Sequence, residues 1–478
     1  MTVRVRFAPS PTGPLHLGNA RIAVINWLYV KKSAGVFVLR VEDTDEKRFD
    51  QASEKTIIRE LLWLGIRPDE GPGFGGTLGP YRQSERRTRY TEIADRLLAD
   101  GCAYRCFCTD QMLEEERRLA AAKGRPPRYS GRCRLLTERD IASRAREPFA
   151  VRFKADFSEI RIDDLVHGQV AFSPDAFGDF VIMRADGAAV YNFSSAVDDA
   201  LMGITHVIRG EDHLPNTPRQ VLIYRALGHN VPTFAHLPLL LNESGEKIKK
   251  REGGFDLESL INQGFIPEGM LNYLASIGNP AHAGKRVFSA EAIARDFNIE
   301  RLGRAGVRVD IDKMTRINAT AIRGLTAEDL AARLAPVASA HGYPAEATGG
   351  LSLVRIADCV RDNILTLNDA AALLPVFFDE LPPIDESARA VLSGDDSRMV
   401  LRALLDRVSN IDELSAEGYL AAVSDVSRLT GRVGRELLMP IRAALTGMEH
   451  GPALDRIAET IGPDLVKKRL ARALDLIS

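Results

Sequence analysis

Cysteine, long apolar runs and an excess of charge of either sign are all scarce in this chain of 478 residues. Five cysteines are too few to stabilise a chain of this length, which excludes a disulfide-framework domain. No run of about 18 apolar residues occurs, and the opening residues MTVRVRF lack the apolar core of a signal peptide. We therefore expect no membrane span and a cytoplasmic location. The net charge of −2 shows no overall basicity, although a basic face balanced by acidic patches would leave this sum unchanged.

The remaining composition is that of an ordinary globular protein, with 45% hydrophobic and 27% charged residues. A chain of this length is too long for one compact core, so we expect roughly three domains or more. No internal repeat or low-complexity tract stands out.

The N-terminal segment predicts a strand, a tight turn and a buried helix. Val3, Val5 and Phe7 alternate with polar residues, which is the period of a strand. A run of Pro, Ser, Thr and Gly follows, and residues 18–33 are apolar on nearly every side, as in a buried helix that ends at Gly35. The helix N-terminus would then lie over the carboxyl end of the strand.

Such a helix N-terminus favours phosphate, because its free N–H groups and the positive end of its dipole both attract anions. His16 and Asn19 stand where the phosphate would lie. The alternative for this fragment alone is a loop with a helix-capping Asn19 and an incidental histidine.

The following elements continue an alternation of strands and helices. Residues 36–41 form a second apolar run that ends in the acidic segment 42–45, and residues 53–64 and 91–100 have helical periods. Acidic residues at the carboxyl end of a strand, beside an anion-binding loop, fit a doubly wound α/β domain.

From about Cys102 the alternation is interrupted by what we interpret as an inserted domain. It contains a cysteine cluster that suggests a metal site, and its expected elements are a charged helix over 110–123 and short strands near 151–153 and 180–183. The α/β pattern then resumes with a strand at 205–209, a helix at 217–227 and a strand at 237–241.

The loop after the last of these strands carries Lys247 and Lys250, two lysines three apart near glycines. It follows the last strand of the second α/β half, as the His16 loop follows the first strand of the first half. In a doubly wound sheet both loops can meet at one crevice, where the lysines would neutralise a polyphosphate. The alternative is a solvated surface loop.

The C-terminal two-fifths is predicted to be all-α, with no further strand beyond about Phe255. Helical periods recur there with N-cap signals at Ser289, Thr326 and Ser415.

Several segments, in this order and spacing, resemble the bacterial glutamyl-tRNA synthetases, which are class I aminoacyl-tRNA synthetases. They are PSPTGPLHLGNAR, VEDTD, PYRQSER, VDDALMG, HVIRGEDH, NTPRQ, KIKKREG and MPIRAALTG. Residues 9–19 are similar to the family's HIGH region and residues 247–251 to its KMSKS loop. Small cytidylyl- and adenylyltransferases share a HIGH-like loop but lack the insertion and the helical tail, and glutaminyl-tRNA synthetases normally carry a β-rich anticodon domain.

The fold that this resemblance implies is α/β. It comprises a Rossmann-like class I catalytic domain, an inserted α+β acceptor-binding domain and an all-α anticodon-binding region. The expected boundaries are 1–101 and 192–245 for the catalytic halves, 102–191 for the insertion, 246–325 for a helical stem-contact domain and 326–478 for the anticodon-binding domain, split near 382.

The resemblance also implies a two-step reaction on ATP, L-glutamate and tRNA(Glu), with Mg²⁺ accompanying ATP. Glutamate's α-carboxylate attacks the α-phosphorus to give glutamyl-adenylate and pyrophosphate, and a ribose hydroxyl of the tRNA then takes the glutamyl group. This chemistry needs positioning and charge neutralisation more than an acid–base side chain. The implied ATP ligands are His16, Gly18, Asn19 and Lys250, and the implied catalytic groups are His16, Lys247 and Lys250.

Glutamate recognition requires cations for a carboxylate and an anion for the ammonium group. By resemblance, Arg6, Tyr191 and Arg209 hold the carboxylate, Glu42 faces the amino group, and Ala8 and Ser10 line the pocket. The planar fork of arginine suits a carboxylate and leaves the neutral amide of glutamine poorly paired. The alternative is that Arg6 and Arg209 form structural ion pairs at strand ends.

The lysine loop departs from the family pattern, because Lys249 stands where relatives have Ser or Thr. The extra cation adds charge but removes a hydroxyl. This departure leaves open a second hypothesis for the function, in which the protein is a catalytically weak paralogue that binds tRNA without charging it.

The cysteine cluster departs as well. Zinc-binding relatives have Cys-x-Cys followed by Cys-x-His, but Cys133-Arg134 is followed by Leu135. In a truncated relative of the family a tyrosine four residues before the last cysteine is the fourth ligand, and Tyr129 occupies that place. Structural Zn²⁺ on Cys106, Cys108, Tyr129 and Cys133 is therefore expected, the alternative being three reduced cysteines without metal.

The C-terminal helices look like an anticodon-binding domain, with Arg432, Arg435, Arg442 and Thr446 in the part that touches unpaired bases. Relatives restricted to tRNA(Glu) use an arginine to discriminate the last anticodon base, and our alignment places Asn363 there. Recognition would then extend to tRNA(Gln), whereas a slip of two residues would bring Arg361 into this role. We expect a monomer.

Overall fold

The structure is a computed structural model that describes residues 2–44, 50–122, 124, 128–156, 158–173, 177–248, 255–279, 286–343 and 352–477. Its contacts divide the chain into two compact units. The catalytic unit comprises Met1–Leu260 with Leu271–Asp310, and the helical unit comprises Ile261–Met270 with Ile311–Ser478. The finer division expected from the sequence remains a prediction.

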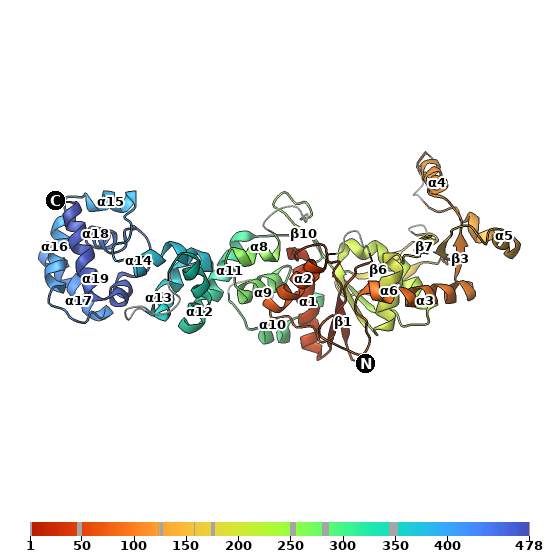
Figure 1. Ribbon diagram of the computed structural model, residues 1–478, viewed down its shortest axis with the longest axis horizontal. Coiled ribbons are helices and arrows are strands. Elements are labelled where there is room, and N and C mark those ends of the chain that lie inside the picture. The colour runs from red at the N-terminus through yellow and green to blue at the C-terminus, as the bar shows by residue number, and fades with distance from the viewer. Residues whose placement is uncertain are drawn as a thin grey trace. The chain divides into compact units, whose positions relative to one another are not determined.

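A six-stranded sheet in the order β2-β1-β8-β9-β5-β6 is the centre of the catalytic unit (Figure 1). Its strands are β1 (Arg4–Phe7), β2 (Val36–Leu39), β5 (Ile160–Asp164), β6 (Gly168–Phe172), β8 (His206–Gly210) and β9 (Thr233–Leu237). All neighbours are parallel except β5 and β6. Successive strands are therefore added to opposite sides of the boundary between β1 and β8, and this switch in strand order is where a doubly wound sheet binds its ligand.

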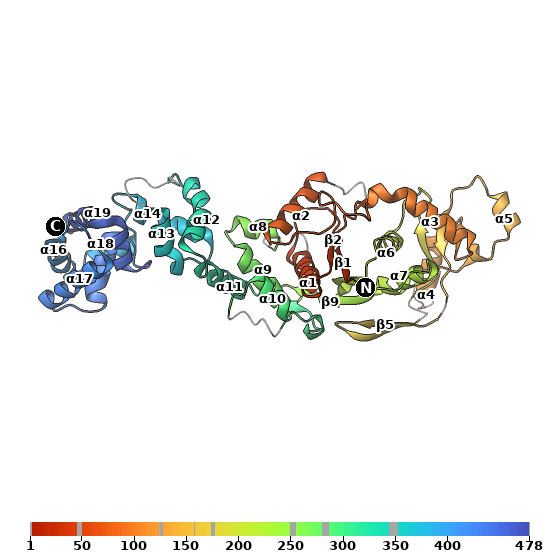
Figure 2. The ribbon, with the colours of Figure 1, turned by 90° about the horizontal axis from the view of Figure 1, so that it is seen from below.

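Helices cover both faces of this sheet. Helix α1 (Leu17–Ser33) packs on β1 and β8, and α6 (Tyr191–Leu201) and α7 (Thr217–Ala226) pack on the opposite face (Figure 2). The N-terminal half of the unit also contains α2 (Gln51–Trp63) and α3 (Arg87–Ala99). Val207 and Phe234 of the strands and Phe193 and Val197 of α6 share one buried core. The predicted doubly wound architecture is therefore confirmed.

The end of α1 differs from the prediction in one detail. The left-handed residue after the helix is Ala34, with φ of 48°, and not Gly35. Gly35 is required for another reason, because a Cβ there would lie 2.4 Å from the Val3 carbonyl oxygen.

The insertion contributes to two sheets. Strands β3 (Ala103–Cys106), β4 (Ala150–Phe153) and β7 (Phe180–Met183) form a separate antiparallel sheet, with α4 (Asp110–Ala122) and α5 (Glu138–Ser143). Its β5–β6 hairpin instead extends the main sheet through β9, where Asp164 pairs with Phe234. The sequence did not predict this hairpin, because each strand has only a few apolar positions and β5 is held in the sheet by pairing with the distant β9.

Two strand predictions need correction. The apolar run 237–241 is not one strand, because Pro238 has no N–H and ends β9, leaving only β10 (Leu240–Leu241) beyond it. A short strand also occurs after Phe255, since β11 (Val307–Arg308) pairs with β10. The remaining helices around this region are α8 (Leu257–Asn262), α9 (Pro267–Ser276) and α10 (Ala290–Asp296).

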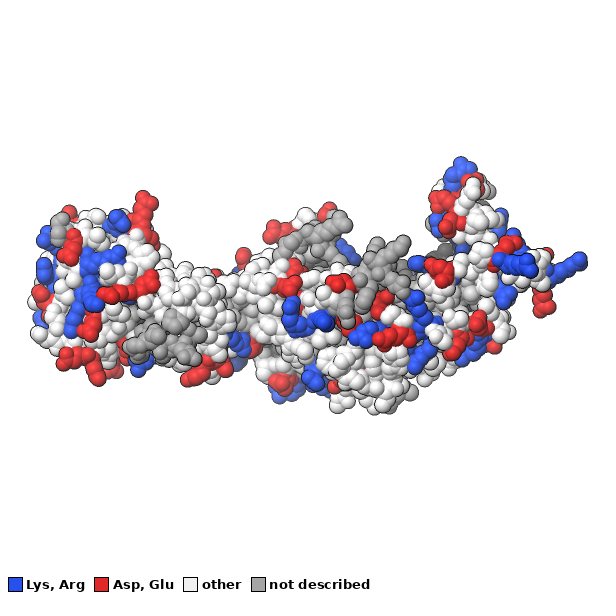
Figure 3. Space-filling model, viewed as in Figure 1, with Lys and Arg blue, Asp and Glu red and all other residues white. Residues whose placement is uncertain are grey.

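The helical unit contains no strand among its described residues. Its main helices are α11 (Ile311–Arg323), α12 (Ala327–Ala340), α13 (Leu353–Val360), α14 (Leu374–Phe378), α15 (Glu386–Leu392), α16 (Ser397–Val408), α17 (Ala416–Thr430), α18 (Arg435–Thr446) and α19 (Leu454–Leu476). The predicted caps are confirmed, since Ser289, Thr326 and Ser415 each accept a backbone N–H three residues later. Figure 3 shows both charge signs interspersed on the face it presents, as the small net charge allows.

Candidate active site

Two loops meet at the sheet edge between β1 and β8. Both strands are parallel neighbours, so the loop after Phe7 and the 3-10 helix Glu211–Asn216 leave the sheet at the same edge. Residues of both line a cavity of 570 Å³. All six residues expected to bind glutamate line it, namely Arg6, Ala8, Ser10, Glu42, Tyr191 and Arg209. His16, Asn19 and Lys247 line the same cavity, so the structure brings the two predicted ligand sets together.

His16 is the N-cap of α1. Its Nδ1 accepts a hydrogen bond from the Asn19 backbone N–H at 3.3 Å, so the alternative in which Asn19 caps the helix is wrong. Gly18 leaves room for the imidazole, because a Cβ there would lie 3.0 Å from two of its ring atoms. Gly18 and Asn19 also line a smaller cavity of 110 Å³ that adjoins the first. The helix dipole and N–H groups make this end of α1 suitable for an anion.

Lys247 lies at the junction of the two cavities and lines both. Its Nζ forms a salt bridge of 2.8 Å with the Asp212 carboxylate, and both side chains are about half exposed. A polyphosphate would compete with Asp212 for this ammonium group. Lys249 and Lys250, the other lysines of the predicted loop, lie outside the described residues.

The backbone on each side of the lysine loop is held by active-site segments. At the start of the loop, the Ile248 N–H donates to the Leu240 carbonyl at 3.2 Å. After it, the Leu17 N–H donates to Phe255 at 2.9 Å and the Leu257 N–H donates to Leu15 at 2.8 Å. The chain that follows the lysine loop therefore pairs directly with the His16 loop, although about 240 residues separate them in sequence.

Two buried guanidinium groups face the larger cavity, with Arg6 exposed by 4% and Arg209 by 5%. Arg6 donates through Nε to Asp199 at 3.0 Å, so the ion-pair alternative holds for part of this side chain. Arg209 donates only to neutral groups among the described residues, and no described carboxylate forms a salt bridge with it. A buried cation without a protein counter-ion is strongly stabilised by an anionic ligand.

Glu42 and Tyr191 complete the polar wall of the cavity. Burial raises the pKa of Glu42 above its ordinary value, and the adjacent Arg40 and Arg6 oppose this shift. The Tyr191 hydroxyl lies 3.0 Å from Nδ1 of His213. Burial and the nearby Arg209 lower the pKa of His213 to about 4, so this imidazole is neutral at pH 7.

Asp199 is a buried carboxylate that binds Arg6 without lining the larger cavity. It accepts hydrogen bonds from Arg6 at 3.0 Å, Arg40 at 2.6 Å and the Tyr224 hydroxyl at 3.0 Å. Burial opposes ionisation, but Arg40 and Arg6 hold the pKa of Asp199 below its ordinary value. Asp199 thus holds Arg6 through Nε only, and the two Nη groups of Arg6 have no partner among the described residues.

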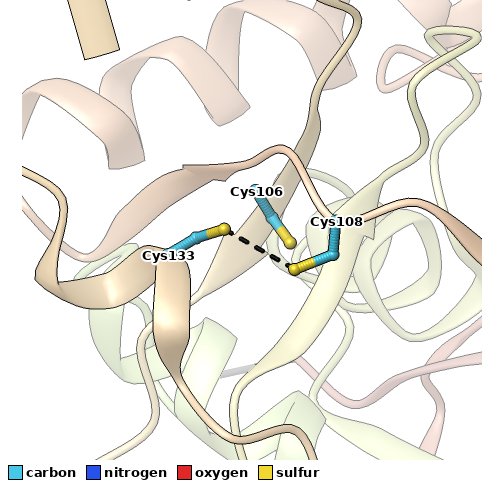
Figure 4. A group of neighbouring side chains, drawn as sticks. All are labelled: Cys106, Cys108 and Cys133. Atoms are coloured by element: carbon cyan, nitrogen blue, oxygen red, sulfur yellow. Dashed lines mark hydrogen bonds between the residues drawn. The ribbon is translucent and has the colours of Figure 1, made fainter. Parts of the chain in front are cut away.

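The three clustered cysteines lie together in the insertion (Figure 4). Their Sγ atoms all fall within 4.8 Å of one another, and Cys108 and Cys133 are 3.6 Å apart. Tetrahedral Zn²⁺ with bonds of about 2.3 Å places neighbouring sulfurs about 3.8 Å apart, so the spacing fits this ion. The Tyr129 hydroxyl lies 3.6 Å from Cys106 and 3.4 Å from Cys108, within reach of a fourth ligand position.

Hydrogen bonds favour the thiolate at one of these cysteines. Burial opposes ionisation of Cys106, but bonds from the Cys108 N–H, from Arg152 and from Tyr129 together lower the pKa of its thiol. Arg152 donates to this sulfur at 3.1 Å and also lies over the Tyr129 ring. The donor set of three sulfurs and one oxygen is therefore compatible with a structural metal ion.

The residues expected to contact the anticodon have different surroundings in the helical unit. Arg435 and Asn363 are exposed, while Arg432 pairs with Asp396 at 2.6 Å. Arg442 is half-buried and donates to the Pro452 carbonyl at 2.9 Å. Thr446 is only 2% exposed, and its hydroxyl closes the last turn of α18 by bonding Arg442 and Met448 backbone groups. In this structure Thr446 supports α18 from within.

Sequence reasoning gave no role to several residues that line the larger cavity or hold the residues that line it. Asp212 and His213 lie in the HVIRGEDH segment and Asp199 lies in VDDALMG, so motif position could have identified them. Arg40 and His236 lie inside apolar strands or beside them, where a single polar residue gives no local signal. Their partners are distant in sequence and become visible only in the folded chain.

Comparison with known proteins gives one consistent result. Residues 2–316 match the family described as class I tRNA synthetases (E and Q), catalytic domain, and residues 329–474 match the anticodon binding domain. The chain is 42% identical over 477 residues to the glutamate–tRNA ligase of Sulfurihydrogenibium sp., covering 99% of both chains. It is 40% identical over 476 residues to that of Carboxydothermus hydrogenoformans, covering 98% of this chain and 99% of the relative.

A solved structure agrees with these relatives. The crystal structure of a glutamate tRNA ligase from Elizabethkingia meningosepticum in complex with its amino acid superposes with a TM-score of 0.88 at 30% identity, over 100% of both chains. Among the described residues, no helix has both the length and the apolar character that a membrane span needs. The motifs, the doubly wound sheet, the adjoining cavities and the full-length relatives lead to one assignment: the chain belongs to the glutamate–tRNA ligases, a family of class I aminoacyl-tRNA synthetases.

Proposed function

We propose that this protein activates L-glutamate with Mg-ATP and transfers it to the 3′ end of tRNA(Glu). The observation that carries the proposal is the larger cavity, in which buried Arg6 and Arg209 and the carboxylate of Glu42 line one space. Two guanidinium groups suit a carboxylate, and an acidic group suits the ammonium of an amino acid. A neutral glutamine side chain would leave the guanidinium groups poorly paired.

The nucleotide lies, in this proposal, beside the start of α1. The glutamate α-carboxylate oxygen bonds to the α-phosphorus while the bond to pyrophosphate breaks, and a tRNA ribose hydroxyl then displaces AMP. The α1 N-terminus with His16, Gly18 and Asn19, together with Lys247 and Lys250, neutralises the phosphates. Loss of one preorganised donor of this type costs on the order of a hundredfold in rate. Mg²⁺, bound with ATP, adds charge neutralisation on the phosphates.

Aminoacylation tests this function directly. Purified protein with ATP, labelled glutamate and tRNA(Glu) is expected to form glutamyl-tRNA, and Lys250→Ala is expected to abolish activation while tRNA binding persists. Absence of product with intact tRNA binding would favour the non-charging paralogue. Lys249→Ser, which restores the hydroxyl of other family members, should change the rate far less than Lys250→Ala.

We propose that Zn²⁺ is bound by Cys106, Cys108, Cys133 and Tyr129 and stabilises the insertion. The sulfur spacing and the adjacent phenol support this assignment. Metal analysis of protein purified without chelators should find about one zinc per chain. Tyr129→Phe removes only the oxygen and should weaken zinc retention, whereas Cys133→Ala should abolish it. Metal-free protein of full activity would contradict the proposal.

We propose further that tRNA(Gln) is also charged, because Asn363 takes the place of a discriminating arginine. Its exposed position on the 3-10 helix Arg361–Asn363 is compatible with contact to a base. Glutamylation of tRNA(Gln) alongside tRNA(Glu) is expected, and Asn363→Arg should reduce it selectively. Charging of tRNA(Glu) alone by the unmodified protein would contradict this part. Sedimentation should show the monomer that we also propose.

A further inference from the structure

Arg209 is held from behind by three neutral side chains. Its Nε donates to His236 Nε2 at 3.1 Å, one Nη donates to Gln220 at 2.7 Å, and the other donates to Thr217 at 2.9 Å. A guanidinium group has five N–H donors, so two remain for a ligand in the cavity that Arg209 lines. These three contacts fix the plane of the group without neutralising its charge.

The contact with His236 requires one particular protonation state. Burial lowers the pKa of His236 to about 4, so the ring is neutral and carries a single proton at pH 7. Its Nδ1 lies 2.6 Å from the Asp164 carboxylate, which can only accept. The proton is therefore on Nδ1, and Nε2 is left as the acceptor for Arg209.

Asp164 is itself fixed at the end of β5. Its carboxylate accepts the backbone N–H groups of Val166 and His167, both at 2.9 Å, and that of His236 at 3.1 Å. Burial opposes ionisation, but the bonds from His236 and from the backbone hold the pKa of Asp164 below its ordinary value. Asp164 and His236 are buried and do not line either of the two cavities described above.

We propose that Asp164 and His236 are positioning residues for glutamate recognition, because they hold Arg209 in the orientation that presents its two remaining N–H groups to the substrate carboxylate. This inference rests on the proposed function, in which the cavity binds glutamate. Asp164 fixes the tautomer of His236, and His236 fixes the guanidinium plane. A residue pair outside the cavity thus determines how well the cavity binds its substrate.

Two substitutions at His236 separate its two nitrogens. The amide of Gln reaches the position of Nε2 and keeps an acceptor for Arg209, whereas the shorter Asn reaches the position of Nδ1 and loses it. In the full-length protein, we expect His236→Asn to raise the KM for glutamate at least tenfold and His236→Gln to raise it less than threefold. The KM values for ATP and tRNA should change less than twofold in both variants.

Asp164→Asn tests the tautomer. Asn keeps an oxygen for the backbone N–H groups but can donate its amide N–H to Nδ1 of His236. The imidazole proton then moves to Nε2, so that two N–H donors, Nε2–H of His236 and Nε–H of Arg209, face each other. The KM for glutamate should rise about tenfold. His206→Asn is the control, because His206 lies on neighbouring β8 and lines neither of those two cavities; its kinetics should be unchanged.

The outcomes distinguish this inference from the function on which it rests. If Arg209→Gln raises the KM for glutamate and His236→Asn does not, the positioning role is overturned and the proposed function stands. Equal effects of His236→Asn and His236→Gln, or parallel rises in the KM for ATP and tRNA, would also overturn it, since they indicate a merely structural role. If Arg209→Gln itself leaves the KM for glutamate unchanged, the assignment of the cavity to glutamate fails and the inference fails with it.

Discussion

Two groups of arginine–carboxylate pairs, one beside the larger cavity and one next to α18, differ in their exposure to water. Behind the larger cavity, Arg6, Arg40 and Arg86 pair with Asp198 or Asp199, and every one of these side chains is 4% exposed or less. At the start of α18, Arg432 pairs with Asp396 and Glu436, with exposed fractions from 36% to 62%. The first group is shielded from water, and the second is in contact with it.

This difference matches the two recognition tasks that we propose for these sites. A small amino acid must be distinguished from close analogues by a few donors, which favours groups whose positions are set before binding. Unpaired RNA bases are larger and more variable. They suit exposed arginines, because such an arginine can leave its carboxylate partner for a base with little loss of free energy. Buried pairs should therefore dominate stability and substrate affinity, while exposed pairs should be nearly dispensable.

The largest expected effect is the loss of the unpaired cation. Arg209→Gln should lower kcat/KM for glutamate by about a thousandfold, because a buried donor to a carboxylate is lost. Steady-state pyrophosphate exchange measures it. The matched control is Arg225→Gln, because Arg225 is exposed on helix α7 and lines neither cavity; this variant should leave the value within twofold. Similar losses in both variants would contradict the difference between the two kinds of arginine.

Removal of a buried partner should have the next largest effect. Asp198 accepts from Arg86, Gln83 and Tyr90 at 2.5–2.8 Å and is fully buried. Asp198→Asn should reduce the free energy of unfolding of the catalytic unit by about 3–5 kcal/mol, since it leaves a buried cation unpaired. Asp396→Asn, which breaks the exposed pair of Arg432, should cost less than about 1 kcal/mol. Urea unfolding followed by circular dichroism gives both values.

Glu60 is a buried carboxylate without a cation close enough to form a salt bridge among the described residues. Replacing it by a neutral amide should therefore stabilise the protein at high pH, whereas the same kind of change at Asp198 should destabilise it. It accepts the Leu15 N–H at 2.8 Å, and burial raises its pKa to about 7. The folded state therefore binds a proton that the unfolded state releases above its ordinary pKa near 4.5, and stability falls as the pH rises from there through about 7.

Glu60→Gln should remove this pH dependence while keeping an oxygen for Leu15. At pH 8.5 the variant should be more stable than the unmodified protein by on the order of 1 kcal/mol, and the difference should shrink at pH 5. Unfolding curves at the two pH values measure it. A variant that is less stable at both values would show that the charge of Glu60 is compensated.

The smallest effect concerns the exposed arginines. Arg435 begins α18 and is exposed, so Arg435→Ala should raise the KM for tRNA roughly fivefold without changing the KM for glutamate. Arg435→Lys keeps the charge and should recover part of the loss. An effect on glutamate binding would indicate that the two recognition tasks are not independent.

The sequence was most informative where function restricts residues locally. The first strand, α1 and the doubly wound order could be predicted from periodicity and turn residues. The resemblance of the motifs to a known family predicted that Arg6, Glu42 and Arg209 share one site. The β5–β6 hairpin could not be predicted, because its pairing with β9 depends on burial against a strand about 70 residues away. The Asp164–His236 pair was invisible for the same reason, since each residue alone is only a polar interruption.

Helix caps show a further limit of prediction from sequence. Ser289, Thr326 and Ser415 cap their helices as expected, because the serine and threonine preference is strong. His16 is an uncommon cap residue, and its role depends on the open space above Gly18, which no propensity encodes.

The β5–β6 hairpin makes the insertion a poor candidate for removal by protein engineering. Deleting residues 102–191 would expose β9 as an unprotected edge strand, open to pairing with other chains. Linker design could not compensate, since the shortened protein would need a new outer strand. The insertion and the catalytic domain therefore share one sheet, even though the sequence suggests two separable modules.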